Sequence, residues 1–102
     1  MSLFNKKHYD SEQATVDASA RTLTTAKVDN SANYPDFKAS GVLIQPTVAI
    51  YYTMDGSTPS STNGIELAAS QFNEILGYQN VKKLKWIRTS SSGVMNVQYF
   101  KE

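Results

Sequence analysis

Residues 48–64 read Val48-Ala-Ile-Tyr-Tyr-Thr-Met-Asp-Gly-Ser-Thr-Pro-Ser-Ser-Thr-Asn-Gly64, and this stretch decides the fold. In its first half Val48, Ile50 and Tyr52 fall on one face of an extended chain, and Ala49, Tyr51 and Thr53 fall on the other. Such a period of two is typical of a strand with one buried face. We therefore expect a half-buried strand over residues 48–53.

The second half of the stretch is rich in turn-forming residues. Asp55-Gly56 is the residue pair that best tolerates positive φ, and Pro59 fixes a bend. The serines and threonines between them can hydrogen-bond their own backbone. The sequence therefore predicts a tight structural turn built on Asp55, Gly56 and Pro59.

Composition narrows the class of protein. With 102 residues, 40% of them hydrophobic and 19% charged, the chain suits one globular domain rather than a disordered segment. A net charge of +1 supplies no field that would draw it to nucleic acid or an anionic membrane. The absence of cysteine excludes disulfides and thiolate sites, and no apolar run approaches the ~20 residues that span a bilayer. We expect a soluble protein made in the cytoplasm.

The remainder of the chain shows further short strand patterns separated by turn residues. Residues 71–76 are ambiguous, since Phe72, Ile75 and Leu76 have helical spacing, but the segment is too short for an independent helix and we predict a strand ending at Gly77. We expect one helical turn over 78–83 and a loop over 29–40. The other expected strands are 14–17, 21–28, 41–46, 64–69, 84–89 and 94–100.

About seven short strands with regularly spaced turns are typical of an all-β protein. The pattern predicts an antiparallel β-sandwich, either jelly-roll or Ig-like, over residues 13–102. Its core is expected to contain Val42, Ile44, Ile50, Tyr52, Trp86, Met95, Val97 and Tyr99.

Residues 1–12 show neither helical nor strand periodicity, and we interpret them as an N-terminal arm. The arm is either a frayed terminus or a segment that docks on a neighbouring subunit through its large apolar side chains. Tyr34 and Phe37 are expected to anchor the loop over 29–40. The candidate interface residues are Leu3, Phe4, Tyr9, Tyr34, Phe37 and Tyr51.

No group of residues predicts catalysis. His8 is the single histidine and lies in the arm, so it has neither companion ligands for zinc nor a positioned nucleophile. Asp55 lies in a turn without the alternating acidic spacing of a calcium loop. Glu66 and Glu74 are close in sequence, but nothing places them across a cleft. We expect no catalytic residue, no metal and no cofactor, and therefore no enzyme.

One basic cluster surrounds the single tryptophan: Lys82, Lys83, Lys85 and Arg88 lie close to Trp86. An aromatic ring among cations can stack on a base or a sugar. The alternative, which we favour, is that Trp86 lies in the core and the basic residues form its solvated flank.

Four stretches of the chain form a recognisable succession: residues 49–60, 64–67, 85–89 and 94–100. Together they resemble a family of small tailed-bacteriophage virion proteins. In that family an apolar strand precedes a Tyr-x-x-Asp-Gly-x-x-Pro-(Ser/Thr) turn, an aromatic-Ile-Arg strand follows, and a strand ends near Tyr-Phe. The resemblance covers about residues 21–100, and its most specific part is the Asp-Gly-Ser-Thr-Pro turn. Chitobiase-like and other surface β-sandwich modules use a similar corner.

The resemblance implies a structural protein of the phage particle, located in the virion after synthesis in the host cytoplasm. The expected role is that of a capsid decoration or cement protein, or of another head-associated protein. Such a protein binds capsid proteins and also copies of itself, with a trimer as one option. A head-to-tail connector is an alternative. From a different class, a carbohydrate-binding module could stack Trp86, Tyr51 or Tyr78 on a sugar. No membrane or nucleic-acid partner is expected.

Overall fold

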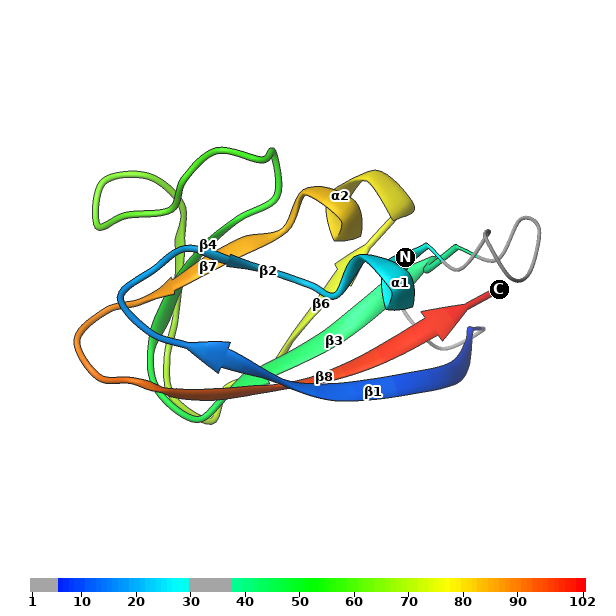
Figure 1. The fold of residues 1–102 in the computed structure, drawn as a ribbon, viewed down its shortest axis with the longest axis horizontal. Coiled ribbons are helices and arrows are strands. Elements are labelled where there is room, and N and C mark those ends of the chain that lie inside the picture. Colours follow the sequence, from blue (N-terminus) through cyan, green and yellow to red (C-terminus); the bar gives the residue numbers. More distant parts are fainter. Residues whose placement is uncertain (1–5, 30–37) are drawn as a thin grey trace.

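The computed structural model describes residues 6–29 and 38–102, and within these ranges the chain forms eight strands and two short helices (Figure 1). The expected all-β architecture is confirmed. In chain order the elements are β1 (Lys7–Val16), β2 (Arg21–Thr22), α1 (Thr25–Val28), β3 (Gly41–Pro46), β4 (Ile50–Thr53), β5 (Ile65–Leu67), β6 (Asn73–Leu76), α2 (Tyr78–Lys83), β7 (Lys85–Arg88) and β8 (Gly93–Lys101).

The strands form two four-stranded antiparallel sheets, with the orders β1-β8-β3-β6 and β2-β7-β4-β5. Each strand of the first half pairs with one of the second half: β1 with β8, β2 with β7, β3 with β6 and β4 with β5. Such pairing arises when one long hairpin is folded over itself. It is the topology of a jelly roll, the first of the two expected sandwich types.

The tip of this folded hairpin is the connection between β4 and β5, residues 54–64. The chain reverses over this whole loop rather than at Asp55-Gly56 alone. Gly56 adopts a φ of 85°, and the hydroxyl of Thr53 donates to the carbonyl of Ser57 at 2.6 Å. The buried ring of Pro59 ties the loop to the body of the protein. Side-chain bonds to the backbone thus replace the hydrogen bonds of a shorter hairpin.

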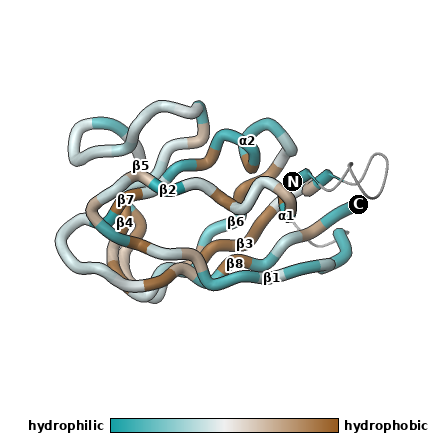
Figure 2. Tube along the Cα trace, viewed as in Figure 1, coloured by the Kyte–Doolittle hydropathy of each residue, from teal (hydrophilic) through white to brown (hydrophobic). Residues whose placement is uncertain are grey.

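The core lies between the two sheets. All eight expected core residues are buried, and Figure 2 shows the hydrophobic segments gathered on β3, β4 and β7. The largest is Trp86, which lies opposite Tyr52 in the pairing of β7 with β4. Its indole Nε1 donates to the carbonyl of Thr15 on β1 at 2.9 Å, so the same side chain joins the two sheets.

The expected arm over residues 1–12 is wrong in its second half. Strand β1 begins at Lys7 and pairs with β8 as far as Val16, so the sandwich includes residues that we placed outside it. A bulge between His8 and Asp10 breaks the period of two. Acidic residues partly buried on the strand, Asp10 and Glu12, also disguise the pattern, because they bond groups of the α1 segment. Residues 1–5 lie outside the described residues.

The expected strand over residues 21–28 is also wrong. Only Arg21–Thr22 pairs as β2, and Thr25–Val28 forms α1. Leu23 and Val28 are both buried, although an extended chain would place them on opposite faces. One helical turn, closed by the bond from the Val28 amide to the Thr24 carbonyl at 3.1 Å, turns both inward.

The ambiguous segment 71–76 resolves as predicted. It contains strand β6, which ends before Gly77, and Gly77 adopts a φ of 93° as the chain enters α2. The expected helical turn over 78–83 is confirmed. Neither described helix has the length or the apolar character needed to cross a bilayer.

Candidate functional site

The candidate interface residues do not gather at one place. Leu3, Phe4, Tyr34 and Phe37 lie outside the described residues. Tyr51 is half-buried on β4, where its cross-strand neighbours are Glu66 and Ile87.

Tyr9 was expected to dock on a neighbour, but it packs within its own domain. Its ring lies 5.9 Å from that of Tyr99, and its hydroxyl donates to the carbonyl of Lys27 at 2.6 Å. Burial, together with the charge of Asp10, raises the pKa of Tyr9 to about 12. The structure therefore gives Tyr9 a structural role within its own domain, and its assignment to an interface stays a prediction.

Sequence reasoning missed a hydrogen-bonded cluster around Glu12. One carboxylate oxygen accepts from the hydroxyl of Tyr99 at 2.5 Å and the other from the hydroxyl of Thr24 at 2.6 Å. Burial and then the carboxylate raise the pKa of Tyr99 far above its ordinary value. The hydrogen bonds of this cluster connect the α1 segment to β1 and β8. No sequence signal marks it, because the three residues are far apart along the chain.

The predicted turn residues Asp55, Gly56 and Pro59 form a structural loop held by hydrogen bonds. The carboxylate of Asp55 accepts from the hydroxyl of Ser57 at 2.5 Å and from its amide at 2.9 Å, and these bonds lower the pKa of Asp55. The side-chain Nδ2 of Asn63 closes the loop by donating to the carbonyl of Thr58 at 2.9 Å. Across residues 6–29 and 38–102, no group of three His, Cys, Asp or Glu could hold a metal ion.

Trp86 cannot act as a stacking platform, because its side chain has no exposed surface. The role that the carbohydrate alternative gave to Trp86 is therefore wrong, and the favoured core placement is confirmed. Tyr78 is half-buried: the Nζ atoms of Lys38 and Lys82 lie 5.1 and 5.8 Å from its ring, and its hydroxyl donates to Asp29 at 2.9 Å. The described contacts thus occupy Tyr78 within the chain.

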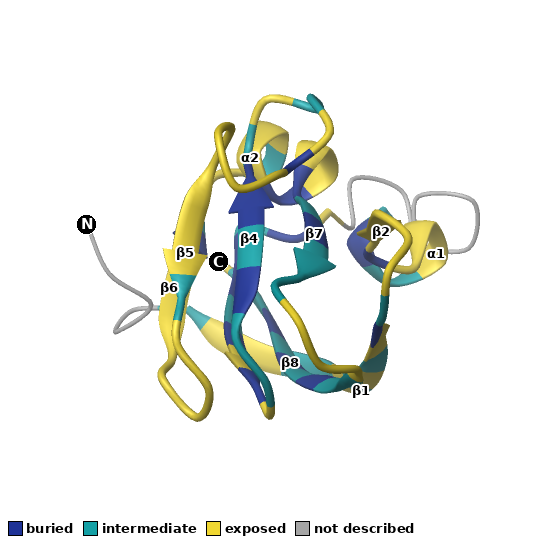
Figure 3. Ribbon diagram, turned by 90° about the vertical axis from the view of Figure 1, so that its left-hand side faces the viewer, coloured by how far each residue is buried: buried dark blue, intermediate teal, exposed yellow. Residues whose placement is uncertain are grey.

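The most exposed part of the described structure is the side formed by β5 and β6. Each is the edge strand of its sheet, and both lie on the same side of the sandwich (Figure 3). Residues 60–74 are all exposed except Leu67. The two exposed large hydrophobic side chains of the described residues lie in this stretch: Ile65 is 49% exposed and Phe72 is 68% exposed. We call the β5 and β6 strands with residues 68–72 between them the open edge.

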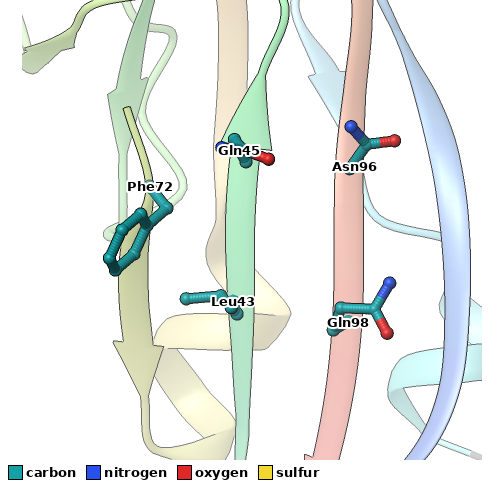
Figure 4. Close-up of a pocket in the computed structure, with 5 residues that line it drawn as sticks. All are labelled: Leu43, Gln45, Phe72, Asn96 and Gln98. Carbon is teal, nitrogen blue, oxygen red and sulfur yellow. The ribbon is translucent and has the colours of Figure 1, made fainter. Parts of the chain in front are cut away.

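A shallow hollow lies next to the open edge, on the outer face of the β1-β8-β3-β6 sheet. It has a volume of about 320 Å³, and its lining contains no ionisable residue. Figure 4 shows that its side chains come from β3, β8 and the residue before β6. They are Leu43, Gln45, Phe72, Asn96 and Gln98.

Comparison with known proteins does not assign the chain to a family. The chain matches no protein-family model, no curated protein and no solved structure. The surfaces and the sequence motifs of the chain are therefore the features that bear on its function.

Proposed function

We propose that this chain is a non-enzymatic structural protein of a bacteriophage virion, most consistent with a capsid decoration or cement protein or another head-associated component. It acts through contacts between subunits. The observation that carries the proposal is the open edge, where two unpaired strand edges and two exposed hydrophobic side chains coincide. The resemblance of residues 49–60, 64–67, 85–89 and 94–100 to phage virion proteins supports placing it in a phage particle.

An unpaired strand edge offers a row of backbone donors and acceptors to another chain. Soluble proteins usually protect such edges with charged side chains, lysine above all, with proline, with very short strands or with a covering segment. Strand β5 reads Ile-Glu-Leu and β6 reads Asn-Glu-Ile-Leu, so each is short and carries one glutamate, and neither contains lysine or proline. An edge of this kind suits the joint between two subunits.

The partner we propose is a second copy of this chain, and then the capsid surface. Head-to-tail contacts between copies close into a ring when the rotation allows it, which is how a trimer would form. Many copies on one shell gain avidity, so each contact can be weak. Jelly rolls occur in viral capsid proteins and in lectins, and this fold-level analogy is compatible with the proposal without deciding it.

The test changes the charge of the open edge. Ile65→Lys places an ammonium group on the edge of β5, and we expect it to abolish self-association while the fold is retained. The matched control is Thr22→Lys, because Thr22 is exposed on β2, the opposite edge strand of the same sheet. Sedimentation velocity over a range of concentrations measures the oligomer, and far-ultraviolet circular dichroism monitors the fold.

A second measurement addresses the virion itself. Antibodies raised against the chain should label the heads of the phage that encodes it, and the gene should lie beside genes for a portal, a protease and a major capsid protein. The proposal fails if purified particles lack the chain. The role of the open edge fails separately if Ile65→Lys and Thr22→Lys associate equally well.

A further inference from the structure

The outer face of the β1-β8-β3-β6 sheet presents two neighbouring rows of side chains that are almost all uncharged. Residues directly opposite one another on paired strands share a face. The single ionisable side chain in either row is Glu74, at the far end of the second row on β6. The first row is Gln13, Asn96 and Gln45, and the second is Ser11, Gln98, Leu43 and Glu74.

The side-chain amides of Asn96 and Gln98, at the centre of these rows, keep hydrogen-bonding groups that the described residues do not use. The side chain of Gln98 makes no hydrogen bond with any described residue. Asn96 uses its Oδ1 atom to accept from Nε2 of Gln13 at 3.2 Å, which leaves its own Nδ2 group available. Both side chains are half-buried and project from β8 onto the same face as Gln45 (Figure 4). The hollow therefore presents both donors and acceptors.

Phe72 forms the apolar rim of the hollow, and the turn before it is fastened to β3. The amide of Ser70 donates to the carbonyl of Pro46 at 2.8 Å, and Nε2 of Gln45 donates to the carbonyl of Ser70 at 3.0 Å. Ser70 itself has a φ of 66°, a conformation that costs a non-glycine residue free energy and that collects at binding sites. The chain thus holds an aromatic ring on the β6 side of the hollow, where it is 68% exposed, whereas Asn96 and Gln98 lie on the β8 side with their amide groups directed away from the ring (Figure 4).

This chemistry selects the occupant. Amide groups donate to and accept from hydroxyl groups, and an aromatic ring packs against the apolar C–H face of a sugar. The lining carries no charge that would recognise an ion; Leu43 and Phe72 supply its apolar surface, and the amides of Gln45, Asn96 and Gln98 supply its hydrogen-bonding groups. Its volume of about 320 Å³ lies at the small end of ligand sites.

We propose that this hollow binds a neutral oligosaccharide, with Gln45, Asn96 and Gln98 bonding its hydroxyl groups and Phe72 packing on a sugar ring. The site is distinct from the aromatic residues that the sequence suggested for sugar stacking. It shares Phe72 with the open edge, but its amide residues Gln45, Asn96 and Gln98 lie on β3 and β8, outside that edge.

The experiment uses the full chain labelled with ¹⁵N and titrated with neutral hexasaccharides of glucose, mannose, galactose and N-acetylglucosamine. At least one of these probes should bind with a micromolar to millimolar dissociation constant. Saturable shifts should then appear in the side-chain NH₂ signals of Gln45, Asn96 and Gln98. The proposal is overturned if no probe binds at millimolar concentration, or if the shifts map to Tyr51 or Tyr78 instead.

Variants then assign the contacts. Gln98→Ala and Phe72→Ala should each weaken binding about tenfold, the loss of roughly 1.4 kcal/mol. Ile65→Ala is the matched control, since it removes the other exposed hydrophobic side chain and should leave the affinity unchanged. Equal affinity in all three variants would overturn the site. Loss of sugar binding in Gln98→Ala with assembly intact would separate this inference from the proposed structural role, because Gln98 lies outside the open edge.

Discussion

The replacement Trp86→Phe tests how the two sheets are held together. Trp86 is fully buried, and its indole donates across the core to the carbonyl of Thr15. Losing that hydrogen bond costs about 1 kcal/mol. The smaller ring also leaves a cavity, at about 1 kcal/mol for each ~40 Å³ that does not close. We expect the free energy of unfolding to fall by about 2–3 kcal/mol in total.

This loss is measurable without unfolding the protein at room temperature, since domains of this size are stable by about 5–15 kcal/mol. It corresponds to a decrease in melting temperature of roughly 10–20 °C. Urea denaturation followed by far-ultraviolet circular dichroism is the appropriate assay, because the variant lacks the only tryptophan and its fluorescence.

The matched control is Tyr51→Phe, on the strand paired with that of Trp86. Tyr51 is half-buried on the outer face, so the loss of its hydroxyl should change stability by less than about 0.5 kcal/mol. If Trp86→Phe were as stable as this control, the indole could not be the side chain that joins the sheets. A wild-type fluorescence spectrum typical of an exposed indole would refute the reasoning equally.

Two further predictions concern the hairpin tip and the tyrosines of β1 and β8. A Cβ atom at Gly64 would lie 2.6 Å from the carbonyl oxygen of Tyr52, at a φ of 121°, so Gly64→Ala should cost about 2–3 kcal/mol of stability. Gly56→Ala meets open space at a φ of 85° and should cost only about 1 kcal/mol; equal denaturation midpoints would contradict the packing of the loop. Tyr9 ionises at a pKa of about 12 in the fold against about 10 when unfolded, so the unfolded chain loses its proton first and stability falls as pH rises from 10 to 12. Tyr9→Phe should reduce that slope in pH-dependent thermal denaturation without abolishing it, because Tyr99 has a raised pKa as well; an unchanged slope would contradict the burial of Tyr9.

Local pattern was sufficient for the class of fold. The alternation around Ile50 and Tyr52 and around Met95, Val97 and Tyr99 identified which faces are buried, because a period of two leaves an apolar face only where a sheet covers it. The turn residues at Asp55-Gly56 and Pro59 located the reversal between two strands, although they did not reveal the length of its loop. The all-β sandwich follows from these local signals.

Only the tertiary structure decided which strands pair and which side chains meet on one surface. Periodicity assigns a residue to a face but does not name the strand beside it, so nothing local pairs residues 7–16 with 93–101. Asp10 and Glu12 are favourable at partly buried positions only because Lys27, Thr24 and Tyr99 reach them from distant segments. For the same reason the row of amide side chains on the outer face forms only when β1, β3 and β8 lie side by side. Single Gln and Asn residues give no signal in the sequence, and the register of the sheet brings them together.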